Sequence, residues 1–402
     1  MRYLSQNKIE NSTVLMRVDF NVPIKDGIII DDTRIINVVP TIDSLIKNKN
    51  KVILISHLGR PQKKSANLSL NLVYHALSKM LNCTVKFCEN IVGKKANKLR
   101  CDLNYGEVLL LENIRFLSDE KIGKTKQATE KNHFLAKELI SNVDYYVNEA
   151  FACSHRESTS MTIIPKYFYK KKFAGFLLQK EINHLSKIKN SPVNPFTAII
   201  GGSKISTKIK LIEKLIVLCD NIIIGGAMAH TFIVYSGGKV GSSLFEPDQV
   251  SKVKIILDQA KKYNCKIHLP LDCISTNQIS NNSLTKTRDI KDIPLDEMSA
   301  DIGPKSIKQF DKIIKNSNKI LWNGPLGIFE YSPFENGTKI IAQSINIATK
   351  LGAYSVIGGG DSIAAINKFN QNFNFSYLST GGGAMLEFFE KEQLPALKSL
   401  ED

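Results

Sequence analysis

The sequence predicts an α/β protein of two similar-sized, doubly wound domains, each with a parallel sheet covered by helices. Three observations lead to this fold class. Short apolar runs, typical of strands buried on both faces, recur along the whole chain. Segments with apolar residues at helical spacing separate these runs, as in successive β-α units. Two X-Pro steps, Ser191-Pro192 and Asn194-Pro195, interrupt the series near its middle and divide it into two halves.

The first half alternates strands with helices. Apolar runs predict strands at residues 14–20, 52–56, 108–112 and 145–148. Helical periodicity predicts helices at residues 33–48, 70–81 and 127–140. This alternation is the pattern of a parallel sheet, because parallel neighbours need a crossover connection.

The second half begins after a helix expected over residues 176–189. The two X-Pro steps end this helix, because the residue before a proline disfavours the helical conformation. Five further strands are expected, at residues 196–200, 221–224, 266–269, 319–322 and 354–357. They predict a second parallel sheet, so the domain boundary is expected between residues 176 and 195.

The composition is that of a globular protein. The chain has 402 residues, with 43% hydrophobic and 23% charged residues. Its first residues are polar, and no apolar run reaches the roughly 18 residues of a spanning helix, so a soluble, intracellular protein is expected. The seven cysteines are scattered without a C-x-x-C pair, which predicts reduced thiols rather than disulfides or a zinc site. Cys153 follows an expected strand end, and we interpret it as a small packed residue.

The formal net charge of +16 raises the question of nucleic-acid binding. The lysines are dispersed, however, often beside asparagine, and no basic stripe with interleaved aromatic residues occurs. We therefore expect no nucleic-acid partner. The positive charge would still attract small anionic substrates.

A glycine turn with two lysines lies between the halves. Residues 197–210 read as a buried strand, the turn Gly201-Gly202, and a helix start at which Ser203 could serve as the N-cap. Lys204 and Lys208 are four residues apart and would share one helix face beside exposed N–H groups, an arrangement suited to anions. The alternative is an ordinary strand-turn-helix whose lysines are solvated.

Arginine and histidine residues follow the expected strands of the first half. Ligands of open α/β sheets bind beyond the carboxyl ends of the strands, so these side chains should meet at one rim. Arginine binds phosphate and carboxylate groups in bidentate fashion, which predicts a small ligand with several negative charges. We call this expected rim the arginine basket: Asp19, Asn21, Arg34, His57, Arg60, Arg115, His155 and Arg156.

Glycine-rich loops follow the expected strands of the second half. They lie at residues 224–228, 322–330, 357–362 and 379–384. Glycine permits close backbone approach, and Gly-Gly-Gly-Asp-Ser before a helix offers N–H donors to phosphate oxygens, with Asp361 free for a cation. Four such loops predict a nucleotide site, with Glu330 placed for ribose hydroxyls.

Seven ordered motifs resemble those of the phosphoglycerate kinase family over essentially the full chain. The motifs are R-V-D-F-N-V-P from Arg17, S-H-L-G-R-P, L-E-N-I-R-F, G-G-S-K-I-S-T-K, W-N-G-P-L-G-I-F-E, G-G-G-D-S and S-T-G-G-G-A. The resemblance implies phosphoryl transfer between 1,3-bisphosphoglycerate and Mg-ADP, giving 3-phosphoglycerate and Mg-ATP in glycolysis.

The resemblance also implies the role of each matching residue. The triose would be held by Asp19, Phe20, Asn21, Arg34, His57, Leu58, Gly59, Arg60, Arg115 and Arg156. Lys204 and Lys208 would contact the nucleotide phosphates and the phosphoryl group that is being transferred. Gly382 would face the same phosphoryl group. Glu330 would bind ribose, Gly359, Gly360, Asp361 and Ser362 would surround the phosphates, and Asp361 would reach Mg²⁺.

The implied organisation has three parts. Residues 1–180 would bind the triose, residues 181–386 the nucleotide, and residues 387–402 would pack back on the first domain, with residues 176–189 as a hinge helix. The protein would be a cytoplasmic monomer without membrane or nucleic-acid partners.

The acceptor carboxylate, with a pKa of about 3.5, is already ionised and needs no general base. Arg34 and Lys204 are therefore expected to neutralise charge during in-line transfer after hinge closure.

Three stretches depart from the family pattern. Ser299 replaces a glycine near the expected base site. Residues 117–131 are lysine-rich and are interpreted as a surface insertion, and residues 153–158 vary around Arg156.

The alternative function is a non-catalytic nucleotide- or nucleic-acid-binding protein of the same fold. The presence of both lysines, Arg34 and Asp361 argues against this alternative.

Overall fold

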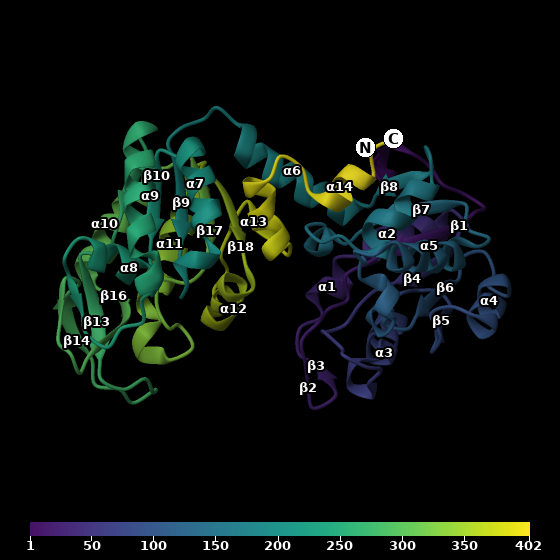
Figure 1. Ribbon diagram of the computed structural model, residues 1–402, viewed down its shortest axis with the longest axis horizontal. Coiled ribbons are helices and arrows are strands. Elements are labelled where there is room, and N and C mark those ends of the chain that lie inside the picture. The colour runs from purple at the N-terminus through teal and green to yellow at the C-terminus, as the bar shows by residue number, and fades with distance from the viewer. The chain divides into compact units, whose positions relative to one another are not determined.

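The computed structural model describes residues 1–402 and divides them into two compact units. Unit 1 comprises residues 1–183 and 391–402, and unit 2 comprises residues 184–390. The first division falls within helix α6 (Phe176–Asn190). Each unit has its own sheet with helices packed on it (Figure 1), so the predicted fold class is confirmed. No helix is both long and apolar enough to cross a membrane.

Unit 1 is built on a six-stranded parallel sheet of order β5-β6-β4-β1-β7-β8. The strands are β1 (Thr13–Arg17), β4 (Lys51–Ile55), β5 (Val85–Cys88), β6 (Val108–Leu111), β7 (Tyr145–Asn148) and β8 (Lys172–Ala174). The helices are α1 (Thr33–Ile36), α2 (Val39–Lys47), α3 (Asn71–Met80), α4 (Lys94–Cys101), α5 (Lys126–Ile140) and α14 (Pro395–Ser399). A small hairpin, β2 (Ile24–Lys25) and β3 (Ile28–Ile29), precedes α1.

Two expectations for unit 1 need correction. The helix expected over residues 33–48 is broken into α1 and α2, and Pro40 lies in the first turn of α2. Proline lacks the N–H of a continuous helix and its ring clashes with the carbonyl four residues earlier, so the helix restarts there. The strand expected over residues 14–20 ends at Arg17, and residues 18–21 continue beyond its carboxyl end without regular secondary structure.

Unit 2 is built on a second six-stranded parallel sheet, of order β12-β10-β9-β17-β18-β19. The strands are β9 (Phe196–Ile200), β10 (Asn221–Ile224), β12 (Lys266–His268), β17 (Lys319–Asn323), β18 (Tyr354–Gly358) and β19 (Tyr377–Ser379). The helices are α7 (Ile209–Leu218), α8 (Met228–Tyr235), α9 (Val250–Lys262), α10 (Pro304–Lys315), α11 (Asn336–Lys350), α12 (Gly360–Phe369) and α13 (Gly383–Glu390).

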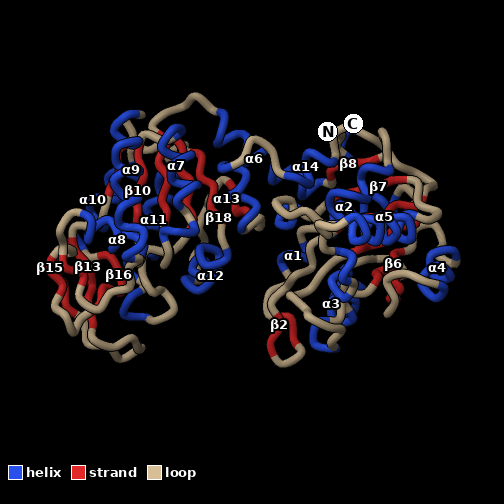
Figure 2. The backbone as a smooth tube through the Cα atoms, in the orientation of Figure 1, coloured by secondary structure: helices blue, strands red, loops and turns tan.

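Unit 2 also contains short strands outside the main sheet. Strands β13 (Asp272–Thr276), β14 (Lys286–Asp289) and β16 (Met298–Ile302) form an antiparallel sheet. Strands β11 (Lys239–Val240) and β15 (Asp292–Ile293) form a parallel pair. Figure 2 shows these strands in red, apart from the main sheet of the unit. The sequence pattern did not predict them, because they are short and partly polar.

Each main sheet is buried on both faces by apolar side chains. Met16, Leu54 and Leu110 lie in the core of unit 1, and Ile199, Trp322 and Ile357 lie in that of unit 2. This double burial explains why the strands read as continuous apolar runs. It also leaves the carboxyl ends of the strands as the places where polar side chains can gather.

Candidate functional site

The carboxyl ends of β1, β4, β6 and β7 place the charged residues of the arginine basket on one side of the unit 1 sheet. Asp19 follows β1, His57 follows β4, Arg115 follows β6 and Arg156 follows β7. Arg34 comes from α1, and one of its terminal nitrogens pairs with Oδ2 of Asp19. Asp31, close to Arg34 in sequence, accepts the Thr33 N–H at 2.9 Å.

Hydrogen bonds connect the loops that form the basket. The Asn21 N–H donates to Asp19 Oδ1 at 3.1 Å, and the Gly59 N–H donates to Asn21 Oδ1 at 2.7 Å. Arg115 Nη1 donates to the Gly59 carbonyl at 2.6 Å. The loops after β1, β4 and β6 therefore form one connected surface. Arg60 is exposed beside Gly59, which leaves its guanidinium available to a ligand.

Burial and neighbouring charges set the protonation of the basket. Burial alone would raise the pKa of Asp19, but the charges of Arg34 and Arg17 and the hydrogen bond from the Asn21 N–H hold that pKa below its ordinary value. Burial lowers the pKa of His57 well below its ordinary value, despite the opposing carboxylate of Asp19 at 3.7 Å. The basket therefore combines an anionic Asp19 with a neutral His57 among arginine cations.

Two of the expected triose residues have buried side chains. Phe20 and Leu58 pack in the core of unit 1. Their side chains fix the loops after β1 and β4, so a contact with a ligand would have to come from their backbone. The sequence pattern could not separate these two roles, since both residues lie inside motif stretches.

The buried thiol of Cys153 lies at the floor of the basket. It packs against Ala150 and Met161, as its interpretation as a packed residue predicts, and its sulfur lies 3.8 Å from His57 Nδ1. Asp19, His57 and Cys153 could present three ligand atoms to a metal ion, all within 4.8 Å of one another. The charges of Arg17, Arg34 and Arg115 act on this thiol, and such positive charge opposes cation binding.

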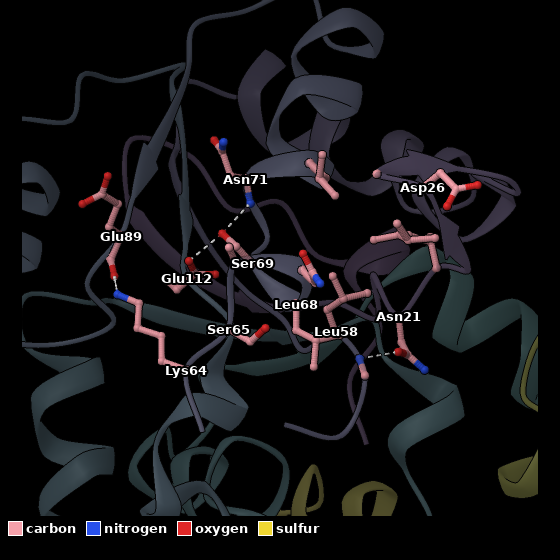
Figure 3. A pocket seen from close by; sticks show the side chains of 17 residues that line it. Asn21, Asp26, Leu58, Lys64, Ser65, Leu68, Ser69, Asn71, Glu89 and Glu112 are labelled. Carbon is pink, nitrogen blue, oxygen red and sulfur yellow. Dashed lines mark hydrogen bonds between the residues drawn. The ribbon is translucent and has the colours of Figure 1, made fainter. Parts of the chain in front are cut away.

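A large cavity lies next to the basket in unit 1. It has a volume of about 1020 Å³, and Asn21, Leu58 and Gly59 belong to its wall (Figure 3). Glu112 is fixed there by hydrogen bonds from the Ser69 hydroxyl and the Leu70 N–H. Among its lining residues three are acidic and one, Lys64, is basic, so this cavity is not the anion-binding surface.

The lysine pair of unit 2 lies at the ends of β9, β17 and β18. A cavity of about 270 Å³ is lined by both Lys204 and Lys208, by Gly359 to Ser362, and by Gly382. The expected helix start is wrong in detail: residues 205–207 form a 3₁₀ turn, α7 begins at Ile209, and Ser203 is not its N-cap. The turn still brings the two lysines to one cavity.

Lys208 is held in place by three oxygens of Gly201 and Asn323, the longest contact being 3.5 Å to the Asn323 carbonyl. Its Nζ donates to the Gly201 carbonyl at 2.5 Å and to Asn323 Oδ1 at 2.8 Å. Burial lowers the pKa of Lys208 to about 8, although the carboxylate of Asp361 opposes this shift. An ammonium has three N–H donors, so a ligand oxygen would bind by replacing the weakest of these contacts, the one to the Asn323 carbonyl. Asn323 was not predicted as a site residue, although it lies in the W-N-G-P motif.

The start of α12 supplies backbone donors to the same cavity. Gly359 has a φ of +100°, and a Cβ there would lie 2.5 Å from Asn323 Nδ2. Only glycine fits this approach. The Ser362 side chain is buried and its hydroxyl accepts the Gly324 N–H at 2.7 Å, so Ser362 offers its backbone rather than its hydroxyl.

A second cavity of unit 2, of about 400 Å³, meets the first at Asp361. Asp361 lines both cavities, and the second is also lined by Ser299, Glu330, His230 and Leu326. Its apolar and small residues suit an aromatic base, and Glu330 lies at its wall as an acceptor. Ser299 is therefore part of this cavity wall, with its N–H donating to Ser243 Oγ at 2.9 Å.

The comparisons with known proteins agree in one family. Residues 4–392 match the family model described as "Phosphoglycerate kinase". The chain is 44% identical over 394 residues to the phosphoglycerate kinase of Thermosipho africanus, covering 98% of this chain and 96% of that relative. It is 39% identical over 396 residues to that of Borrelia garinii, covering 98% of each.

Two solved structures are similar over nearly the whole chain. The phosphoglycerate kinase of Coxiella burnetii has a TM-score of 0.86 at 36% identity, covering 99% of this chain and 98% of that one. The enzyme of Pyrococcus horikoshii has a TM-score of 0.85 at 32% identity, covering 100% and 98%.

Proposed function

The chain belongs to the phosphoglycerate kinase family, and we propose that unit 1 binds the triose and unit 2 the magnesium nucleotide. The activity is the reversible transfer of a phosphoryl group from 1,3-bisphosphoglycerate to ADP, giving 3-phosphoglycerate and ATP in glycolysis. One observation supports the assignment of the triose to unit 1 and of the nucleotide to unit 2. Each unit has a surface suited to anions, with arginines in unit 1 and with lysines and glycines in unit 2.

A coupled assay of ATP consumption with 3-phosphoglycerate tests the activity directly. We expect turnover that depends on both substrates. ATP binding without 3-phosphoglycerate-dependent turnover would instead support a non-catalytic nucleotide-binding protein.

In the proposed mechanism this chain supplies charge and alignment rather than a base. The carboxylate of 3-phosphoglycerate is ionised at pH 7, so no residue needs to remove a proton from it. Arg34, Arg60, Arg115 and Arg156 neutralise the triose, while Lys204, Lys208 and the backbone at Gly382 face the transferring group. Exclusion of water during transfer prevents hydrolysis.

Asp361 fits a magnesium site of the kind that phosphoryl-transfer enzymes use. Mg²⁺ is usually held by one or two carboxylates together with substrate phosphate oxygens. Asp361 is one carboxylate at the junction of the two unit 2 cavities, beside the lysine pair. When bound, Mg²⁺ would neutralise phosphate charge.

We further propose that the protein acts as a monomer in the cytoplasm. Light scattering tests the oligomeric state, and cell fractionation tests the localisation.

Replacing Asp361 with asparagine should weaken use of the Mg-nucleotide and leave triose binding nearly intact. The substitution removes one metal-binding charge of unit 2, and the triose basket lies in unit 1. Calorimetry with Mg-ADP and with 3-phosphoglycerate measures both affinities. An equal loss of both would contradict the assignment.

The rate should fall at high pH because of Lys208. Its pKa is lowered to about 8, and a lysine is charged below its pKa and neutral above it. We therefore expect kcat/KM for the nucleotide to decrease as the pH rises through about 8. A pH profile of kcat/KM measures this, and a flat profile up to pH 10 would exclude the proposed role of the ammonium charge.

Transfer requires the two ligands to meet, so we propose hinge closure that depends on both. Small-angle scattering should give a smaller radius of gyration with both ligands than with either alone. Identical profiles in all four ligand states would reject closure as the gating step.

A further inference from the structure

A buried chain of hydrogen bonds leads from the lysine-rich segment to the triose basket. The segment 117–131 was interpreted as a surface insertion, and its lysines are indeed exposed. Glu120, however, is only 5% exposed and lies in a 3₁₀ turn, Ser118–Glu120. Its Oε1 accepts the Ser160 hydroxyl at 2.6 Å and its Oε2 accepts the Ser160 N–H at 3.0 Å. The interpretation as a surface insertion is therefore wrong at Glu120.

Ser160 links Glu120 to Arg17 through hydrogen bonds to both residues. A serine hydroxyl has one proton, and that of Ser160 is donated to Glu120. Its oxygen is then free to accept, and Arg17 Nε donates to it at 2.9 Å. Arg17 is 2% exposed and also donates to the Val18 carbonyl, so its guanidinium is held in a fixed plane.

Arg17 in turn fixes the imidazole of His57. Arg17 Nη2 lies 3.3 Å from His57 Nδ1. Arginine can only donate, so this contact requires Nδ1 to accept and places the imidazole proton on Nε2. Asp19, at 3.7 Å from Nδ1, is too distant to bind a proton there and is occupied by Arg34 and the Asn21 N–H. His57 thus keeps an Nε2–H that can donate to an anionic triose.

We propose that Glu120 is a positioning residue for the triose site, acting through Ser160 and Arg17 to fix the tautomer and orientation of His57. This inference rests on the proposed role of the basket in triose binding. It assigns a function to the segment that precedes α5. Glu120 itself touches no substrate in this arrangement.

The test compares Glu120→Gln and Ser160→Ala with two matched variants. Ser160→Thr keeps the hydroxyl and should retain wild-type kinetics. Ser158→Ala removes a hydroxyl that lies 3.4 Å from Ser160 Oγ but is not a link between Arg17 and Glu120, so it should also behave as wild type. In Glu120→Gln and Ser160→Ala we expect the KM for 3-phosphoglycerate to rise roughly tenfold, with kcat and the KM for ATP little changed.

A spectroscopic readout separates positioning from a merely structural role. In ¹⁵N-histidine-labelled enzyme, the His57 nitrogen resonances should report the Nε2–H tautomer in wild type and Ser160→Thr. They should shift toward a tautomer mixture in Glu120→Gln and Ser160→Ala. A lower melting temperature with unchanged His57 resonances and unchanged triose KM would overturn the proposal.

One more variant distinguishes failure of this inference from failure of the proposed triose site. His57→Gln should weaken 3-phosphoglycerate binding, measured by calorimetry. If it does not, the assignment of the basket to the triose fails. If His57→Gln weakens binding while Glu120→Gln and Ser160→Ala do not, only the positioning role of Glu120 fails.

Discussion

Replacing Arg34 with alanine is expected to lower kcat by roughly 10²-fold or more, about the effect of removing one preorganised donor to developing charge. The guanidinium pairs with Asp19 and is about one-third exposed, so part of it can reach a ligand. Its planar fork matches two equatorial oxygens of a phosphoryl group in flight, and a contact that strengthens only in the transition state changes kcat rather than KM.

Two further variants make this result specific. Arg34→Lys should recover little activity, because a point charge lacks the fork. Asp32→Ala is a control for helix α1, since Asp32 occupies the N-cap without a side-chain hydrogen bond and should leave kcat near wild type. Steady-state kinetics measure kcat for these variants, and melting curves measure their stability. A near-normal kcat in Arg34→Ala would exclude Arg34 from the transferring group and leave it only its ion pair with Asp19.

Replacing Lys208 with methionine is expected to lower kcat/KM for the nucleotide by roughly 10²-fold to 10³-fold. Methionine keeps most of the apolar stem and removes the ammonium, so the positive charge at the cavity and the hydrogen bonds to Gly201 and Asn323 are lost. Lys210→Met is the matched control, because Lys210 is exposed two residues further along the same segment.

The Lys208 variant also tests the origin of the pH dependence. The decrease of kcat/KM through about pH 8 should disappear in Lys208→Met and persist in Lys210→Met. Persistence of the same decrease in both variants would assign it to another group. If Lys208→Met and Lys210→Met have comparable activity, Lys208 is not part of the phosphate site.

The fold was predictable where a single pattern dominated. Continuous apolar runs such as residues 196–200 become doubly buried strands, and the sequence shows this directly. Strand β5 was missed because Lys86 interrupts its apolar pattern, and β8 was missed because it has only three residues and begins with Lys172. In β8 the side chain of Lys172 is nevertheless buried, donating to the Ser399 and Glu401 carbonyls, and local sequence does not reveal such long-range acceptors.

Candidate site residues were predictable where a cation follows a strand or begins a helix. Arg34, Arg115 and Lys204 stand out in this way, and their roles stay predictions. Arg17 and Asn323 did not stand out as candidates, because in the proposed site they act through other side chains. A charged residue such as Arg17 within an otherwise apolar strand is the signal that could have identified it, since burial of a charge requires partners.

The return of residues 391–402 to unit 1 has a consequence for protein synthesis. Unit 2 is one continuous stretch of chain, whereas unit 1 is interrupted by it. On the ribosome, unit 2 can therefore finish folding while unit 1 still lacks α14 and the carbonyls that hold Lys172. A nascent chain halted before residue 391 would carry a complete unit 2 beside an unfinished unit 1, exposed to chaperones and proteases until the last segment is synthesised.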